Sequence, residues 1–337
     1  MCLMDKITGS ILGGAIGDAL GYTVEFKSYN EIINLYGNSG INMYEYEDDT
    51  GKALISDDTQ MSLFTAEALL RCDKNKITDD TLKSIFNSYL DWLNTQAGDR
   101  FYKCKDGLMS VKEMYASREP GRTCINVLAH KLFGTIEKPI NCSKGCGGIM
   151  RTAPIALYYN PDIVPILQID KLAAQASALT HGHKLGYIPS AIFAHILNTV
   201  TYRGYCLENA VLDAISAAKV IFGVSEDMDY IEKLINLAVE YSNNNLSDIE
   251  NINVLGEGRV AEETLAIALY CALKYQNNFS AAVIAAVNHS GDSDSTGAVA
   301  GNIVGGLVGF NSISQEWKHN LELYDIIIDM AHKLAIL

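Results

Sequence analysis

Proline, basic residues and cysteine pairs are all scarce in this sequence. Only 6 of the 337 residues are proline, and no Pro-, Ser- or Gly-rich stretch separates one part of the chain from another. The nearest candidate for a linker, residues 242–248, has the composition of a polar surface loop. Because 48% of the residues are hydrophobic, the chain can bury a large core. We therefore expect a single domain over residues 1–337.

The shortage of basic residues argues against one class of partner. Lysine and arginine number 26 against 40 aspartates and glutamates, which gives a net charge of −14. Proteins that bind a phosphate backbone carry a dense basic stripe, so we expect no nucleic-acid partner.

Long apolar runs are also missing from the sequence. Residues 297–313 are the nearest to a membrane span, but Asn302, Asn311 and repeated glycines favour a buried helix, and we expect no membrane insertion.

The cysteines form no recognisable pattern. None of the 8 belongs to a Cys-x-x-Cys pair, and Cys142 and Cys146 stand four apart, which is wrong for a redox pair. We expect reduced thiols in a cytoplasmic protein.

The N-terminal apolar stretch contains Gly13, Gly14 and Asp18 and has no cleavage signature, so we expect no signal peptide.

The sequence does contain helical periodicity along most of its length. Apolar residues recur every three to four positions from Ile7 to Leu20, and Gly9, Gly13 and Gly17 form one stripe that would let a second helix approach closely. Strand patterns are almost absent, so we predict an all-α, compact fold. We expect Pro189 to kink or delay the helix that contains it. Further helices are expected at 30–36, from 59 and from 78 onward, and at 122–133, 163–180, 184–200, 207–222, 226–242, 258–275, 279–288, 295–310 and 320–335.

Two short acidic runs are the most informative features of the chain. Residues 56–59 and 292–296 each place two carboxylates and at least two hydroxyls in front of a helical segment. Helix capping explains one carboxylate in each run, but adjacent ionised aspartates repel unless a cation or a donor lies between them. Four aspartates with hydroxyls make an oxygen-rich site that suits Mg²⁺ or Mn²⁺ better than zinc, and the carboxylate count fits two ions.

Two other interpretations of these runs stay open at this point. Each run is also compatible with simple helix capping. The spacing Asp292-x-Asp294-x-Thr296 also occurs in haloacid-dehalogenase-type phosphatases, where the first aspartate is a nucleophile. That reaction requires a preceding strand in a parallel sheet, normally near the N-terminus. Here the motif follows a long helical chain, so we do not favour it.

Two glycine-rich segments accompany the acidic runs. The first spans residues 13–26, where we interpret Asp18 as a structural acid at a helix end and expect Glu25 to be freer to enter a site. The second spans residues 143–151, and its glycine N–H groups can cradle a diphosphate in front of a helix. His181 and His183 form a possible metal pair, but beside an oxygen-rich site they fit hydrogen bonding better.

In chain order, these segments resemble the ADP-ribosylglycohydrolases, the family that includes dinitrogenase-reductase-activating glycohydrolase and the ADP-ribosyl-arginine hydrolases. The resemblance spans roughly residues 7 to 310, and its motifs are specific only in combination. The motifs are Gly17-Asp18-Ala19-Leu20-Gly21 with Glu25-Phe26, Ser56-Asp57-Asp58-Thr59-Gln60-Met61, Gly145-Cys146-Gly147-Gly148-Ile149-Met150-Arg151, Leu179-Thr180-His181 and Gly291-Asp292-Ser293-Asp294-Ser295-Thr296-Gly297.

The resemblance implies an all-α fold with a binuclear Mg²⁺ or Mn²⁺ centre in a cleft. The family usually has threonine where Ser56 and Ser295 stand, and both serines keep the hydroxyl. His181 matches a histidine that faces bound ADP-ribose. Residues 118–123 resemble a second substrate-facing loop, in which Glu119 takes the place of an aspartate of the nitrogenase-linked relatives. The implied metal ligands are Ser56, Asp57, Asp58, Asp292, Asp294 and Ser295, and the implied diphosphate-binding residues are Gly145, Cys146, Gly147 and Gly148.

The implied activity is hydrolysis of the bond between C1″ of the distal ribose and a protein side chain. Glu25 falls near the metals and is our candidate for the group that moves the protons, with Asp292 as the substitute. We expect an ADP-ribosylated protein as substrate, ADP-ribose as product, and a monomer. Arginine is the favoured modified residue, because an acidic cleft attracts a guanidinium and the first two motifs look closer to bacterial arginine-linked members. A serine-linked or O-acetyl substrate stays open, as does a catalytically silent ADP-ribose-binding or crystallin-like protein.

Overall fold

The computed structural model describes residues 1–97 and 106–336. Within these ranges the regular structure is helical, and extended pairing is limited to isolated bridges between Ala53 and Leu321 and between Gly145 and Val260. The all-α prediction is confirmed, and a phosphatase motif on a parallel sheet is excluded. The α-helices are α1 (Leu3–Tyr22), α2 (Tyr29–Tyr36), α3 (Asp57–Leu70), α4 (Asp79–Thr95), α5 (Arg122–Ala129), α6 (Ala153–Tyr158), α7 (Ile166–Ala178), α8 (Lys184–Asn198), α9 (Leu207–Phe222), α10 (Glu226–Tyr241), α11 (Asp248–Leu255), α12 (Ala261–Lys274), α13 (Phe279–Val287), α14 (Ser293–Val308), α15 (Gln315–Lys318) and α16 (Tyr324–Ala335).

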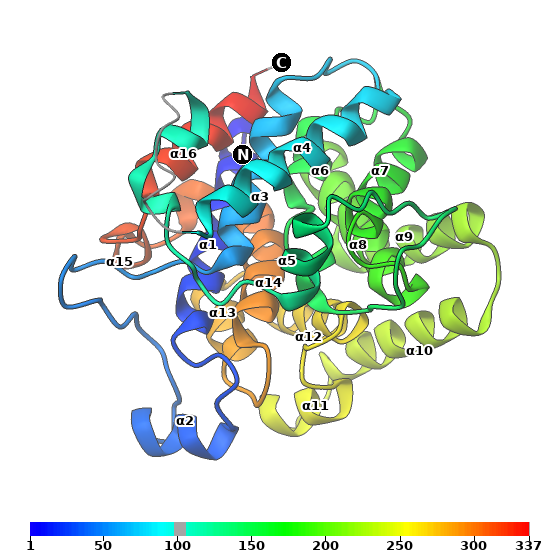
Figure 1. The fold of residues 1–337 in the computed structure, drawn as a ribbon. Helices are drawn as coiled ribbons and strands as arrows, with labels where there is room; N and C mark the ends of the chain where they lie inside the picture. Colours follow the sequence, from blue (N-terminus) through cyan, green and yellow to red (C-terminus); the bar gives the residue numbers. More distant parts are fainter. Residues whose placement is uncertain (98–105, 337) are drawn as a thin grey trace.

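The first helix and the late helix α14 lie side by side in the middle of the molecule (Figure 1). They run antiparallel along a glycine seam, in which a Cβ atom at each glycine would overlap the backbone of the other helix. The predicted close approach of a second helix is therefore confirmed. The seam also brings the C-terminal end of α1 beside the N-terminal end of α14. The facing pairs are Gly9–Gly305, Gly13–Gly301 and Gly17–Gly297.

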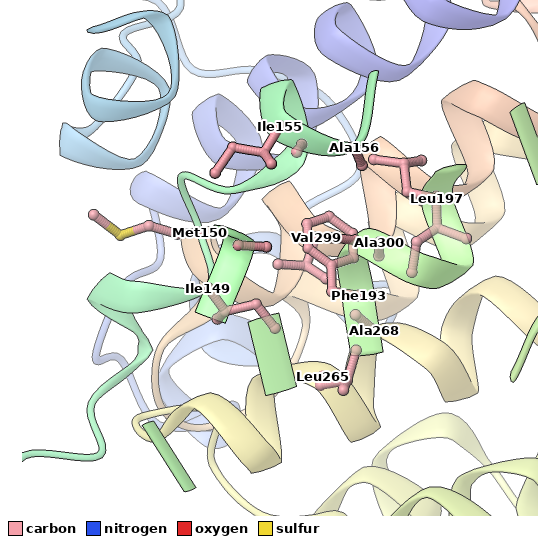
Figure 2. Close-up of a cluster of buried hydrophobic side chains, with 14 of the residues drawn as sticks. Ile149, Met150, Ile155, Ala156, Phe193, Leu197, Leu265, Ala268, Val299 and Ala300 are labelled. Atoms are coloured by element: carbon pink, nitrogen blue, oxygen red, sulfur yellow. The ribbon is translucent and has the colours of Figure 1, made fainter. Parts of the chain in front are cut away.

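Around this seam the buried apolar side chains form one continuous hydrophobic core. Figure 2 shows part of it, where α6, α8, α12 and α14 contribute Ile155, Phe193, Leu265 and Val299. Each of these four side chains is fully buried. Burial of one such side chain stabilises the fold by about 1.5–3 kcal/mol. The core therefore gives the helix ends that carry polar residues a rigid support.

Most predicted helices agree with the structure to within a few residues, and the exceptions have local causes. The helix α11 was not predicted, although Ser247 and Glu250 form a capping box at its start. Of the two effects expected of Pro189, a kink or a delayed start, the delay does not occur, because α8 begins at Lys184 and contains the proline. After α8 the chain continues as a short π-helix, η5 (Thr199–Arg203), that ends at Gly204 with φ +66°.

Two sequence features have simple counterparts in the structure. Among the described helices, none is both long and apolar enough to cross a membrane. The seven cysteines within the described ranges are unpaired, and Cys104 lies outside the described residues.

Candidate active site

Three helix ends that carry acidic residues meet at one place in the fold. The last turns of α1 carry Asp18, the first turn of α3 carries Asp57 and Asp58, and Asp294 lies in the first turn of α14 behind its N-cap Asp292. The partial positive charge of a helix N-terminus favours carboxylates at two of these ends. The glycine seam holds the ends of α1 and α14 together.

Asp18 organises the loop in front of α3. Its fully buried carboxylate accepts hydrogen bonds from the backbone N–H groups of Ser56 and Thr59, each at 3.1 Å, and from the Thr59 hydroxyl. Ser56 in turn caps α3, since its Oγ accepts a bond from the Asp58 N–H at 3.2 Å. The position of Asp18 agrees with its interpretation as a structural acid.

The second acidic run is held by a turn at Gly291. This residue has φ +127°, and a side chain there would overlap the carbonyl oxygen of Glu257. The Gly291 carbonyl accepts a hydrogen bond from the Phe26 N–H at 2.7 Å, which ties the segment after α1 to the turn. As a result, carboxylate oxygens of Glu25, Asp292 and Asp294 all lie within 4.8 Å of one another.

Burial and mutual repulsion raise the pKa values of the clustered carboxylates. Burial and the charge of Asp292 raise the pKa of Glu25 to about 9. Burial, with Asp18 and Asp292, raises the pKa of Asp57 to about 8, although the Gly121 N–H opposes this shift. Burial and neighbouring carboxylates also hold the pKa values of Asp58 and Asp294 well above their usual range.

Two buried oxygens of this cluster, Oδ2 of Asp58 and Oδ1 of Asp292, have no hydrogen-bond partner. A buried carboxylate without a partner is costly, and nearby carboxylates add repulsion. An oxygen-rich donor set with these properties fits hard divalent cations such as Mg²⁺ or Mn²⁺. The residues that the structure brings together therefore fit the metals that the sequence implied.

The carboxylates line a cavity of about 510 Å³, together with Ser295. We call the part formed by Glu25, Asp57, Asp58, Asp292 and Asp294 the acidic wall. A second part, the glycine–histidine wall, is formed by Gly145, Cys146, Gly147 and His181.

Cys146 links the two walls. Its thiol donates a hydrogen bond to Oδ2 of Asp292 at 3.1 Å. Its backbone N–H donates to the Arg259 carbonyl at 3.3 Å, so this amide is already engaged within the protein. The loop that includes Cys146 is thus fixed against the segment before α12.

Two of the predicted site residues do not line the cavity. Ser56 is fully buried as the cap of α3. Gly148 packs against Ser177 and Gly186, where an added Cβ would lie 3.0 Å from the Ser177 Cβ and 3.1 Å from the Gly186 carbonyl oxygen. Both residues support the walls from behind rather than face the cavity.

The loop of residues 118–123 covers the cavity on the side of α3. The Asp57 N–H donates to the Arg118 carbonyl at 3.2 Å, and the Gly121 N–H donates to Oδ2 of Asp57 at 3.2 Å. Glu119, with φ +50°, lines the cavity. Arg118 forms an ion pair with Glu322 at 2.8 Å, which anchors the loop near α16.

The two neighbouring histidines have different surroundings in the structure. Nδ1 of His183 accepts a hydrogen bond from the Leu185 N–H at 3.1 Å and thereby caps α8. His181 lines the cavity, and burial, followed by the charge of Arg151, lowers its pKa to about 3. His181 is therefore an uncharged hydrogen-bonding group at the cavity, whereas the ring of His183 is engaged in capping α8.

Sequence reasoning did not select three further cavity-lining residues, Phe26, Cys124 and Met150. Cys124 and Met150 are buried and occupy positions typical of an apolar core. Phe26 has φ +57°, and an exposed aromatic residue in this conformation leaves no local signal in the sequence. Its place after Glu25 in the first motif was the available indication.

Comparisons with known proteins agree with this geometry. The family model described as ADP-ribosylglycohydrolase matches residues 2–337. ADP-ribosylhydrolase ARH3 of Bos taurus is 25% identical over 216 residues, and the match covers 57% of this chain and 58% of the relative. ADP-ribosylarginine hydrolase Tri1 of Serratia proteamaculans is 25% identical, with 98% of this chain and 79% of the relative covered.

Two further matches extend over most of both chains. ADP-ribosyl-(dinitrogen reductase) glycohydrolase of Rhodospirillum rubrum is 24% identical, with 95% of this chain and 91% of the relative covered. A solved structure described as an ADP-ribosylglycohydrolase-related protein complex has a TM-score of 0.71 at 22% identity, covering 99% and 98% of the two chains, which shows a shared fold. Because the family model matches nearly the whole chain, this protein belongs to the ADP-ribosylglycohydrolase family.

Proposed function

We propose that this protein is a metal-dependent hydrolase that removes ADP-ribose from modified protein side chains, with ADP-ribosyl-arginine as its substrate. The observation that carries the proposal is the convergence of Glu25, Asp292 and Asp294 in a cavity that also contains a glycine loop. Charged carboxylates at one end and a phosphate-binding loop at the other suit a ligand with a ribose and a diphosphate.

The residues that would hold two divalent cations are Asp57, Asp58, Asp292 and Asp294, with the hydroxyls of Ser56 and Ser295. Bound there, Mg²⁺ or Mn²⁺ would supply Lewis-acid stabilisation of negative charge and bring water near the reacting carbon. The Ser56 Oγ accepts the Asp58 N–H, and Ser56 is not among the residues that line the cavity, so a metal bond from its hydroxyl would need a small rearrangement at the start of α3.

Glu25 is the group best placed to move protons in this reaction. It is part-buried, and one of its carboxyl oxygens lies within 4.8 Å of carboxylate oxygens of Asp292 and Asp294, so it lies where a proton would have to move. Cleavage of the bond at C1″ builds positive charge on the ribose, and the carboxylates of the acidic wall stabilise that charge. Asp292 is the substitute candidate, because it lies within the same cluster.

The arginine linkage rests on the charge of the cavity and on the relatives. Glu119 lines it, and a carboxylate at this position favours a guanidinium leaving group over an uncharged serine oxygen. The relative from Serratia proteamaculans, named as an ADP-ribosylarginine hydrolase, aligns over 98% of this chain at 25% identity and supports this linkage by its name. The covered share does not separate the linkages, because ARH3 of Gallus gallus also aligns over 98% of this chain, at 24% identity. The proposal also includes a monomer in the cytoplasm, where the unpaired thiols stay reduced.

The deciding experiment is a side-by-side assay with Mg²⁺ on arginine-linked, serine-linked and O-acetyl ADP-ribose. The proposal expects the fastest release from arginine. Faster release from serine would overturn the linkage. Release from none of the three, with ADP-ribose still bound, would indicate a catalytically silent binding protein.

A further inference from the structure

A buried arginine lies behind the glycine–histidine wall without a carboxylate partner. Arg151 is fully buried, and none of the ion pairs between described residues includes it. Its guanidinium donates to the Ala176 carbonyl at 3.1 Å and to the Thr180 hydroxyl at 2.6 Å, and lies 4.3 Å from the centre of the Tyr89 ring. A buried charge without a counter-ion is costly, so its position calls for a physical explanation.

The Thr180 hydroxyl lies between the Arg151 guanidinium and the ring of His181 and is within hydrogen-bond distance of both. An arginine can only donate hydrogen bonds, so the Thr180 oxygen is the acceptor and its single proton is left for another group. Nδ1 of His181 lies 2.8 Å from that oxygen, whereas the Ser177 carbonyl lies at 3.5 Å. The shorter distance favours Nδ1 as the acceptor of the Thr180 proton over the Ser177 carbonyl, and the Cys124 thiol is a further neighbour of this hydroxyl.

The second ring nitrogen of His181 then carries the proton. The ring is uncharged, because burial and Arg151 both lower its pKa, and a neutral imidazole has one donor and one acceptor. Nε2 lies beside the glycine loop, since Cβ atoms added at Gly145 and Gly147 would be 3.4 and 3.5 Å from it. Nε2–H is therefore a hydrogen-bond donor at the cavity wall.

We propose that Arg151 and Thr180 are positioning residues, which fix His181 as an Nε2–H donor to a phosphate oxygen of ADP-ribose. The choice of acceptor rests on the proposed function. A neutral donor held in one tautomer binds an anionic oxygen without first losing or gaining a proton. Arg151 adds a positive charge behind the same loop, where an anionic diphosphate gains from it.

The first test is the tautomer of His181 in the wild-type protein without ligand. Long-range ¹H–¹⁵N NMR separates the two neutral tautomers from the charged ring, and the His181→Gln variant assigns the signal. The inference expects the Nε2–H tautomer at pH 7. An Nδ1–H tautomer or a charged ring would overturn it. This measurement needs neither metal nor substrate, so its outcome is independent of whether the protein hydrolyses anything.

The second test measures ADP-ribose affinity in Thr180→Val, which removes the hydroxyl at nearly constant volume, and in Thr180→Ser, which keeps it. We expect Kd to rise by about tenfold or more in Thr180→Val, because a hydrogen bond to a charged group is lost, and to return towards wild type in Thr180→Ser. The matched control is Thr8→Val, since the Thr8 hydroxyl is buried without a partner near the far end of α1.

Thermal melts establish that each variant is folded before its affinity is compared. Equal affinity in wild type and Thr180→Val would refute the inference, and so would an affinity loss with the His181 tautomer unchanged. If Thr180→Val does not fold, Thr180→Ser must still show the Nε2–H tautomer. A wild-type protein with that tautomer but no affinity for ADP-ribose would instead refute the proposed function and the acceptor named here.

Discussion

The two walls of the cavity have opposite electrostatic properties. The acidic wall gathers buried carboxylates with raised pKa values, and two of its oxygens have no partner. The glycine–histidine wall contains the uncharged imidazole of His181 and the thiol of Cys146, which is hydrogen-bonded to Asp292. The buried Arg151 lies behind this wall. The first wall keeps buried oxygens without a hydrogen-bond partner, which a bound cation would satisfy. The second wall is held by hydrogen bonds within the protein. The walls should therefore respond differently to mutation, metal and pH.

The largest expected effect comes from a break in the acidic wall. Asp292→Ala should lower kcat/KM by more than about a hundredfold, because it removes both a metal ligand and a member of the Glu25 cluster. The helical circular dichroism should persist, since a loop-borne carboxylate adds little to the core. Asp162→Ala, at an exposed position, is the control. A fully active Asp292→Ala protein would contradict the metal mechanism.

Metal should stabilise the acidic wall and leave the other wall unaffected. At a Mg²⁺ concentration of 100 times Kd, we expect about 2.7 kcal/mol of added stability, measured by urea unfolding with and without EDTA. The same addition should do little in Asp292→Ala and act normally in Thr180→Ser. Absence of bound Mg²⁺ and Mn²⁺ by calorimetry and by metal analysis would show that the account of this wall is wrong.

Acid should destabilise the glycine–histidine wall through His181. Its pKa is lowered to about 3 in the folded state, so between that value and about 6.5 the unfolded state binds more protons. Stability therefore falls as pH drops below about 6.5. Between pH 7.5 and pH 5 the wild type should lose about 2 kcal/mol more than His181→Gln. Parallel losses in urea unfolding of the two proteins would mean that His181 titrates normally.

The smallest effect is expected from a bulkier glycine loop. In Gly147→Val the added atoms begin 3.1 Å from the Cys124 sulfur and 3.2 Å from Cε1 of His181 and extend into the ligand's space. ADP-ribose affinity should fall by about tenfold, while bound metal is unchanged. Gly306→Ala is the control, because its added Cβ meets neighbours at ordinary distances of 3.5 Å or more. Unchanged affinity in calorimetry would remove this loop from the binding site.

The sequence predicted the parts of the site that depend on local rules. Glycines at every fourth position of the first helix indicated a close helix partner, which the structure shows. Paired aspartates in front of helices indicated an acidic cluster, and its occupation by cations stays a prediction. Both features have a short-range cause, in sterics for Gly17 and in charge repulsion for Asp57 and Asp58. The all-α fold followed from periodicity for the same reason.

What the sequence did not predict depends on contacts between distant segments. The exclusion of Gly148 from the cavity is set by Ser177 and Gly186, and nothing in a row of glycines distinguishes it from Gly147. Arginine is by type a surface residue, because a buried guanidinium is rare. Arg151 is nevertheless enclosed by the Ala176 carbonyl and the Thr180 hydroxyl at the end of α7 and by the Tyr89 ring of α4. Such partners become visible only in three dimensions.

The two helices of the glycine seam are synthesised at very different times, so the seam cannot form until most of the chain has been made. Its two helices are Leu3–Tyr22 and Ser293–Val308, so the first emerges from the ribosome long before its partner exists. At about 5–20 residues per second, the interval is about 15–55 s. During that interval the glycine stripe of α1 lacks the helix that it packs against, and the second acidic run, residues 292–296, cannot meet Glu25. The cavity is therefore among the last parts of the molecule to form. A ribosome-stalled chain that ends before residue 292 contains the other residues of the cavity but lacks Asp292, Asp294 and Ser295, so it should have no hydrolase activity.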